Sequence, residues 1–195
     1  MSNGSFGIVV EGEGDFDAKV YRELIRKICH ANPQIEVIPA DGKAELRKKC
    51  ARLLRWFEHV TLTGGPVNKA LVLRDTDGAD RRVVEDDLNG RIDKPTYSFP
   101  DGIAVHGVVQ EMETWLLADP AAIRRVANGR AVKFNPARPL EELRDTKGLF
   151  QEVLSSAGLN YTGETCRRIA QELDLTILRV ACPSFGDFER KVLDP

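Results

Sequence analysis

Short apolar runs alternate with amphipathic stretches through the first 119 residues of the chain. The runs are rich in β-branched residues, which is typical of buried strands. Between them, apolar residues recur at i, i+3 and i+4, as they do on the buried face of a helix. We therefore expect strands at 6–10, 35–39, 70–74 and 103–109, and helices at about 15–30, 43–59 and 79–91.

This alternation predicts an α/β fold. Strands separated by helices build a parallel sheet, here of about four strands, with helices on both faces. From residue 120 onward the pattern is helical, and Asp119 with Pro120 supplies an N-cap followed by proline at the first helical position. We expect residues 1–119 to form the α/β domain and 120–195 to form a C-terminal helical extension. Because no flexible linker separates them, the extension should pack on the same core.

The composition argues against several classes of protein. No apolar run approaches the roughly 20 residues of a membrane-spanning helix. A secretory signal requires a basic stretch ahead of its apolar segment, and the first apolar segment here has none. The four cysteines are scattered without a C-x-x-C pair, which favours reduced thiols in a cytoplasmic protein. The net charge is -2, so nucleic-acid binding would need a local basic patch, a metal ion or a partner.

Acidic residues follow three of the four predicted strands. They are Glu11 and Glu13 after the first strand, Asp75 and Asp77 after the third, and Glu111 and Glu113 after the fourth. Ligands of parallel sheets bind beyond the carboxyl ends of the strands, and carboxylates crowded together need a compensating cation. A hard divalent ion, Mg²⁺ or Mn²⁺, would supply that charge. The alternative is that these acids simply decorate helix N-termini, where the helix dipole stabilises them.

The stretch DTDGAD at 75–80 allows three interpretations. A calcium loop of the EF-hand type is excluded, because its sixth position is Asp80 where glycine is required. A haloacid-dehalogenase phosphatase would use Asp75 as nucleophile and Asp77 as acid/base. Against this alternative, Ala79 replaces the usual Thr or Val, and no convincing acidic pair follows on a later strand. The third interpretation combines DTDGAD with the glutamate that follows the first strand.

A glutamate after an N-terminal strand and a D-x-D after a later strand resemble the Toprim domain of topoisomerases, bacterial primases and OLD-type nucleases. The segments EMETWLLAD (111–119), YTGET (161–165) and CPSF with a following D-F (182–188) extend the resemblance. Over most of its length the chain is similar to small stand-alone Toprim-like proteins, the domain of unknown function forty-two seventy-six. Where such relatives read EG-x-T-E, this chain reads EGEGD, so Asp15 either replaces the last acid or caps a helix.

The resemblance implies a Toprim-like fold and a divalent-metal-dependent nuclease or related phosphotransfer enzyme that uses Mg²⁺ or Mn²⁺. In this scheme Asp75 and Asp77 are metal ligands, and Glu11 is a ligand or the general base. Either Glu111 or Glu113 binds a second ion; the two are about 200° apart on a helix, so only one can face the site.

Other functions stay open at this point. Members of such families often lie beside ATPases in phage-defence or mobile-element loci, which implies an ATPase partner and allows a non-catalytic regulatory subunit as the alternative. A homo-oligomer is compatible with the sequence, and no membrane partner is expected. Neither Tyr97 nor Tyr161 is placed as topoisomerase chemistry would require, so hydrolysis of a phosphodiester is favoured over the strand passage of topoisomerases.

Two groups of basic residues are candidates for nucleic-acid contact. Lys48, Arg52 and Arg55 share one face of the predicted helix at 43–59, where they could follow a phosphate backbone. Lys147, at the start of a later helix, could reach a phosphate. The simpler interpretation of both groups is a solvated helix surface.

Overall fold

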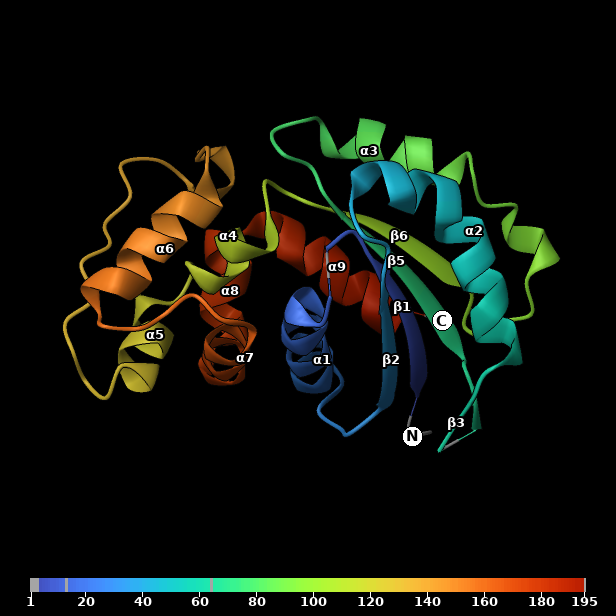
Figure 1. The fold of residues 1–195 in the computed structure, drawn as a ribbon, viewed down its shortest axis with the longest axis horizontal. Coiled ribbons are helices and arrows are strands. Elements are labelled where there is room, and N and C mark those ends of the chain that lie inside the picture. The colour runs from blue at the N-terminus through green and yellow to red at the C-terminus, as the bar shows by residue number, and fades with distance from the viewer. Residues whose placement is uncertain (1–3, 13, 64, 195) are drawn as a thin grey trace.

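A four-stranded parallel sheet forms the centre of the computed structural model, which describes residues 4–12, 14–63 and 65–194 (Figure 1). The strand order is β2-β1-β5-β6, and every neighbouring pair is parallel. The strands are β1 (Ser5–Val10), β2 (Gln34–Pro39), β5 (Lys69–Asp75) and β6 (Ile103–Val108). The α/β prediction is therefore confirmed. Ahead of β5, the strands β3 (Thr61–Leu62) and β4 (Gly65–Pro66) form a two-stranded antiparallel ribbon.

Helices cover both faces of the sheet, as the hydrophobic pattern predicts (Figure 1). Those of the first part are α1 (Phe16–Cys29), α2 (Lys43–His59), α3 (Arg81–Asn89) and the 3-10 turn η1 (Lys94–Thr96). Those that follow β6 are α4 (Met112–Leu116), α5 (Pro120–Val126), η2 (Leu140–Glu142), α6 (Thr146–Ser156), α7 (Gly163–Glu172), α8 (Leu175–Ala181) and α9 (Pro183–Leu193). None of the described helices combines the length and apolarity needed to cross a membrane.

The strands send alternate side chains into two separate cores. Val9 and Val72 pack with the buried face of α2, whereas Ile8 and Leu71 belong to a larger core on the opposite face. That larger core contains α1 together with buried residues of the helices that follow β6. Its centre is Trp115, which is fully buried and lies 5.1 Å from the ring of Phe188 on α9. The helices that follow β6 thus share one core with the sheet.

The backbone of β1 approaches α2 closely at Gly7. A Cβ atom at this position would lie 2.6 Å from the ring of Phe57, which is fully buried. Neither the central strand nor the buried ring can move without disturbing the rest of the core. Gly7 is therefore required by packing and not by backbone conformation.

We expect Gly7→Ala to lower the free energy of unfolding by about 1–3 kcal/mol, because the added methyl group overpacks the β1–α2 contact. Urea denaturation followed by circular dichroism measures the change. Gly186→Ala is the matched control, since Gly186 lies in α9 with open space around it, and alanine there should stabilise the helix by about 0.5–1 kcal/mol. Equal stability of Gly7→Ala and wild type would show that the contact is not tight.

Candidate functional site

The carboxyl ends of β1, β5 and β6 bring acidic residues to one edge of the sheet. Glu11 directly follows β1, and Asp75 is the last residue of β5, one residue beyond the expected carboxyl end of that strand. Burial raises the pKa of Asp75 well above its ordinary value, and the charges of four neighbouring carboxylates, Asp17, Glu113, Glu11 and Asp77, raise it further. The residues that the sequence predicted from three separate strand ends therefore act on one another, together with Asp17.

Glu11 has both acidic and basic neighbours. Its pKa is raised first by burial and then by the charge of Asp77, whereas Lys43 and Arg74 act in the opposite direction. The Arg74 Nε lies 3.6 Å from the Glu11 Oε2, which is buried and has no hydrogen-bond partner among the described residues. The Arg74 Nη1 also lies 3.3 Å from the Asp87 Oδ2, and this second ion pair restrains the Arg74 side chain. The Glu11 carboxylate is thus held in place but retains unused acceptor capacity.

The loop that carries Asp77 is held in an unusual backbone conformation. Asp77 and Gln110 both have positive φ, of 47° and 59°, and the Asp77 N–H donates to the Gln110 carbonyl at 3.0 Å. Between them, the buried Thr76 Oγ1 accepts a hydrogen bond from the Gln110 N–H at 2.9 Å. Left-handed conformations at non-glycine residues cost free energy and concentrate at functional sites. The Asp77 side chain is exposed and pairs with Lys43 at the start of α2.

The structure distinguishes Glu111 from Glu113, which the sequence left open. Glu111 is the N-cap of α4, and its Oε2 also accepts from the Thr146 hydroxyl at 3.1 Å and the Lys147 N–H at 2.8 Å. Glu113 is only 5% exposed, and it is the one whose charge acts on Asp75 and Asp17. Glu113 therefore faces the other carboxylates, while Glu111 ties the beginning of α4 to the beginning of α6.

Asp17 belongs to the same group, although the sequence pointed to Asp15. Asp15 occupies the N-cap position of α1 without a capping hydrogen bond and pairs at the surface with Lys19 and Arg22. Asp17 is partly buried instead. Burial and the charge of Glu113 raise its pKa to about 6, against the opposing effects of Lys147 and a backbone hydrogen bond from Gly12. Asp15 thus has the predicted N-cap position of α1, but its carboxylate pairs with basic side chains and makes no capping hydrogen bond.

Gly12 explains how Asp17 can lie so close to the end of β1. A Cβ atom at residue 12 would overlap the Asp17 carboxylate, so only glycine leaves room for it. Gly14 adopts a left-handed conformation with φ of 62°, which reverses the chain before α1. Glu13 lies outside the described residues. We call Glu11, Asp17, Asp75, Asp77 and Glu113 the acidic cluster.

Comparison with known proteins assigns a family to this arrangement. A family described as "Domain of unknown function (DUF4276)" matches residues 10–193. The chain belongs to this family. The match includes the last residue of β1, the other three strands of the sheet, the acidic cluster and the helices up to α9, so the C-terminal helices are part of the matched region. No curated protein and no solved structure was found to match the chain.

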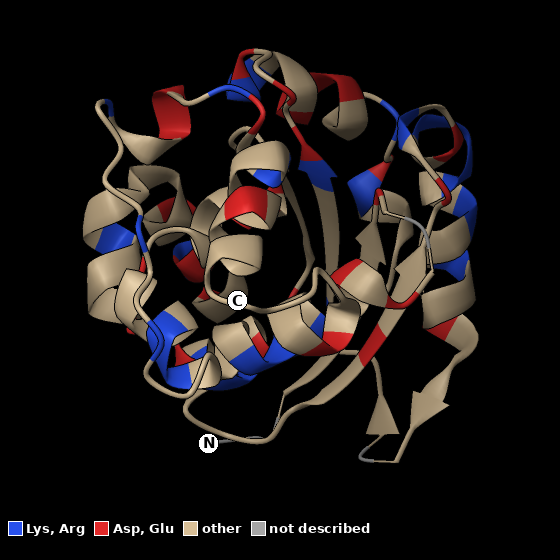
Figure 2. Ribbon diagram, turned by 60° about the vertical axis from the view of Figure 1, so that its left-hand side comes forward, with Lys and Arg blue, Asp and Glu red and all other residues tan. Residues whose placement is uncertain are grey.

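The basic residues predicted from sequence occupy different places in this family member. Lys147, at the start of α6, lies close enough to the acidic cluster to lower the pKa of Asp17 and Glu113. Lys48 and Arg52 are exposed on α2, where Lys48 pairs with Glu45. Arg55 bonds to Thr96, ahead of β6, and therefore lies near the amino ends of the strands. Figure 2 shows basic and acidic segments interspersed around the fold.

A polar cleft opens beside the acidic cluster. It has a volume of about 370 Å³ and is lined by Asp77, Gly78, Gln110, Glu111, Arg144 and Asp145. Its walls come from the loops after β5 and β6 and from the segment before α6. Volumes of this size are typical of small-ligand sites.

The acidic cluster has some, but not all, of the features of a divalent-cation site. The donor set suits such an ion, since every member is a carboxylate and the Glu11 Oε2 lacks a hydrogen-bond partner among the described residues. As the side chains stand, no three acidic, histidine or cysteine residues in the described chain are arranged to hold a metal ion. Instead, the Lys43 ammonium group supplies positive charge to Asp77. The chemistry of the donors fits a cation, and their present positions do not form a closed coordination shell.

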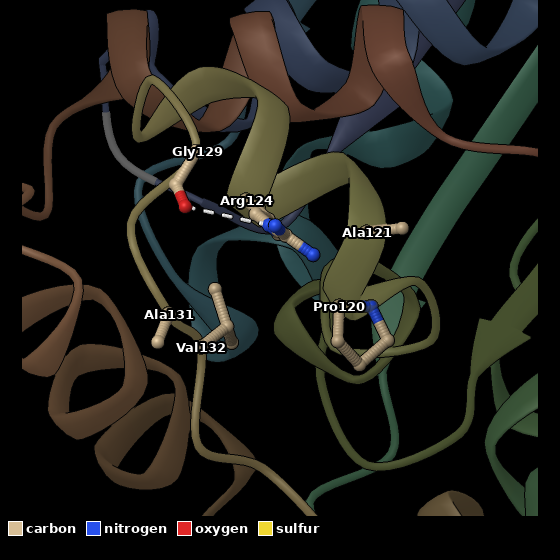
Figure 3. Close-up of a pocket in the computed structure, with 6 residues that line it drawn as sticks. All are labelled: Pro120, Ala121, Arg124, Gly129, Ala131 and Val132. Carbon is tan, nitrogen blue, oxygen red and sulfur yellow. Dashed lines mark hydrogen bonds between the residues drawn. The ribbon is translucent and has the colours of Figure 1, made fainter.

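A slightly larger cavity, of about 430 Å³, lies beside α5 (Figure 3). It is lined mainly by apolar atoms, and its charged residue Arg124 donates a hydrogen bond from Nε to the Gly129 carbonyl at 3.4 Å. The residues that line it include no acid and no nucleophile. The acidic cluster is therefore the better candidate site.

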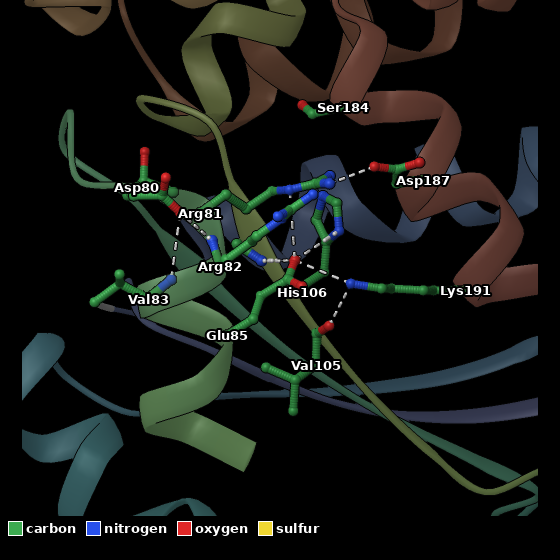
Figure 4. A network of polar contacts seen from close by, with 12 residues as sticks. Asp80, Arg81, Arg82, Val83, Glu85, Val105, His106, Ser184, Asp187 and Lys191 are labelled. Atoms are coloured by element: carbon green, nitrogen blue, oxygen red, sulfur yellow. Dashed lines mark hydrogen bonds and ion pairs between the residues drawn. The ribbon is translucent and has the colours of Figure 1, made fainter. Parts of the chain in front are cut away.

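A second polar network lies between α3, β6 and α9 (Figure 4). Glu85 pairs with Lys191 at 2.9 Å, and Arg81 pairs with Asp187, so two ion pairs hold α9 against α3. His106 is buried beside Glu85, and burial followed by the charges of Lys191 and Arg81 lowers its pKa well below the ordinary value. A neutral histidine within a network of paired charges indicates a structural role, in agreement with its lack of any ligand spacing in the sequence.

Asp17 gives a testable pH dependence of stability. The folded protein takes up the Asp17 proton near pH 6, whereas the ordinary value is 3.8. Between these values the folded state binds more protons than the unfolded state, so the free energy of unfolding falls as the pH rises. We expect Asp17→Asn to raise the free energy of unfolding at pH 8 by about 1–2 kcal/mol and to flatten this decline.

Urea titrations at a series of pH values between 4 and 8 measure both effects. Asp15→Asn is the control, because its carboxylate is 59% exposed and paired at the surface, and little change is expected. A stability profile of Asp17→Asn that coincides with that of the wild type would mean that Asp17 is not buried among like charges.

Proposed function

We propose that the chain is a divalent-metal-dependent phosphodiester hydrolase of Toprim type that acts on nucleic acid in the cytoplasm. The observation that carries this proposal is the acidic cluster at the carboxyl edge of a parallel sheet, whose members raise one another's pKa. Helix-cap decoration does not account for it, because Asp75 ends a strand and Glu113 is buried. Crowded buried carboxylates are stabilised when a cation binds between them.

In this proposal the ligands of Mg²⁺ or Mn²⁺ are Asp75, Asp77 and Glu11, and Glu113 with Asp17 would serve a second ion. The metal would activate a water molecule and neutralise charge on the phosphate. Lys43 would leave Asp77 when the ion binds, because both cations compete for one carboxylate. Positive charge released in this way would then be available to a substrate phosphate.

The chain's own residues then have separate tasks. Glu11 can accept a proton as general base, because its Oε2 has no hydrogen-bond partner among the described residues and because burial and the charge of Asp77 raise its pKa. Arg74 keeps the Glu11 side chain oriented through the ion pair between its guanidinium group and the Glu11 carboxylate. Arg144 and Lys147 are exposed at the edge of the cleft and would contact phosphate oxygens. A cleft of about 370 Å³ suits a single strand better than a duplex.

A non-catalytic partner or regulatory subunit of an ATPase is the second candidate. The observation that favours it is the Lys43–Asp77 pair, which neutralises Asp77 without a metal ion. Either function is compatible with an ATPase partner in a phage-defence or mobile-element system. Metal binding and cleavage by the purified chain separate the two candidates.

We expect the wild-type chain to bind Mn²⁺ and to cleave single-stranded DNA or RNA in its presence. Asp75→Asn should lower the cleavage rate by about a hundredfold or more, because it removes a charged ligand. Calorimetric titration with Mn²⁺ and cleavage of labelled oligonucleotides measure the two effects. Asp86→Asn, on the exposed face of α3, is the control. Equal cleavage by wild type and Asp75→Asn would exclude catalysis at this site.

The two basic surfaces give a further prediction. Arg144→Ala and Lys147→Ala should each weaken oligonucleotide binding severalfold and reduce its salt dependence, since each removes about one phosphate contact. Arg52→Ala, on α2, should change neither. Fluorescence anisotropy in Ca²⁺ at several salt concentrations measures affinity without cleavage. The reverse order of effects would place the nucleic acid on α2.

A further inference from the structure

Tyr161 links the acidic cluster to the C-terminal helices, although the sequence gave it no role. It lies between α6 and α7, and its hydroxyl group donates a hydrogen bond to the Glu113 carboxylate. Its ring packs against Phe16 at a centroid distance of 4.8 Å and against Phe150 at 6.1 Å. A side chain from residues 120–195 therefore contacts a member of the acidic cluster directly.

The two aromatic contacts fix the ring from two directions. Phe16 begins α1 immediately before Asp17, and Phe150 lies on α6. The Lys147 ammonium group lies 5.8 Å from the centre of the Tyr161 ring. A ring held in this way can present its hydroxyl group in only one direction, so the hydrogen bond to Glu113 is preorganised. The same ring thus contacts the residue next to Asp17 in the chain, while its hydroxyl group binds Glu113.

The hydrogen bond matters because Glu113 is almost completely buried. Burial raises the pKa of Glu113, and donation from Tyr161 opposes this by favouring the charged carboxylate. The other titratable groups near Glu113 come from every element packed around it. They are Asp17 and Tyr21 on α1, Asp75 on β5, Glu111 ahead of α4, Lys147 on α6 and Cys166 on α7. Among the side chains of the described residues, Tyr161 is the one that donates a hydrogen bond to the Glu113 carboxylate.

We propose that Tyr161 is a positioning residue of the candidate site, which holds Glu113 toward the acidic cluster and makes the C-terminal helices part of that site. Its consequence for metal binding and cleavage rests on the proposed function, whereas its effect on Glu113 does not. Tyr161 touches no reacting group in this scheme and acts through Glu113 alone.

Tyr161→Phe tests the proposal, because it removes the hydroxyl group and keeps the ring. We expect the pKa of Glu113 to rise by about one unit, followed by NMR of protein labelled with ¹³C at its glutamate carboxyl groups. The Mn²⁺ affinity should fall about tenfold. The acidic limb of the pH–rate profile should move to higher pH, with kcat reduced and KM little changed.

Tyr97→Phe is the matched control. The Tyr97 hydroxyl donates to the Ala51 carbonyl at 3.1 Å, and its ring stacks on Phe99 far from the acidic cluster. This variant also loses one hydrogen bond from a tyrosine, so it should lower stability without moving the titration of Glu113. A change in Glu113 titration common to both variants would reflect loosened packing and would overturn the proposal.

The outcomes separate the two proposals. An unchanged Glu113 titration in Tyr161→Phe overturns the positioning role, whether or not the protein cleaves nucleic acid. A shifted titration in a protein that neither binds Mn²⁺ nor cleaves supports positioning and removes the proposed function. If Tyr161→Phe does not fold, 3-fluorotyrosine placed at 161 keeps the ring and donates more strongly, so the Glu113 pKa should fall; no change would overturn the proposal.

Discussion

Electrostatic repulsion among the acidic cluster is the constraint around which the rest of the structure is arranged. A parallel sheet places the carboxyl ends of its strands at one edge, and here three of them deliver carboxylates. The fold opposes this repulsion with Arg74 and Lys43 on one side and with Lys147 and the Tyr161 hydroxyl on the other. The strained loops at Asp77 and Gln110 lie at the same edge. These features are costly for stability alone, and a bound cation would explain their combination.

The C-terminal helices contribute both to the core and to this edge. Trp115 and Phe188 join α4 and α9 beneath the sheet, and the Glu85–Lys191 pair fastens α9 to α3. On the opposite side of the same helical layer, Glu111 binds the start of α6 and thereby sets the place of Lys147. The family match, which runs from residue 10 to 193, covers these helices together with β2, β5 and β6.

The fold followed from sequence wherever local pattern and tertiary packing agree. Strands that are buried on both faces have apolar runs as their sequences. The apolar stripes of α1 and α2 face the two cores, one each. The pattern failed where elements are short. The short helix α8, with Ile177 and Val180 exposed, carries no clear apolar stripe. Such elements are stabilised by their surroundings more than by their own sequence.

The sequence by itself determined Glu11, Asp75 and their shared edge, because a residue next to the end of a parallel strand has its position fixed by the sheet. The sequence did not determine which side chains face the acidic cluster among residues that lie more than one or two positions beyond the end of a strand. Tertiary structure selected Glu113 over Glu111 and Asp17 over Asp15, and it brought Tyr161 next to Glu113 across 48 positions of the chain. Those choices depend on helix rotation and on packing between distant segments, which no local pattern records.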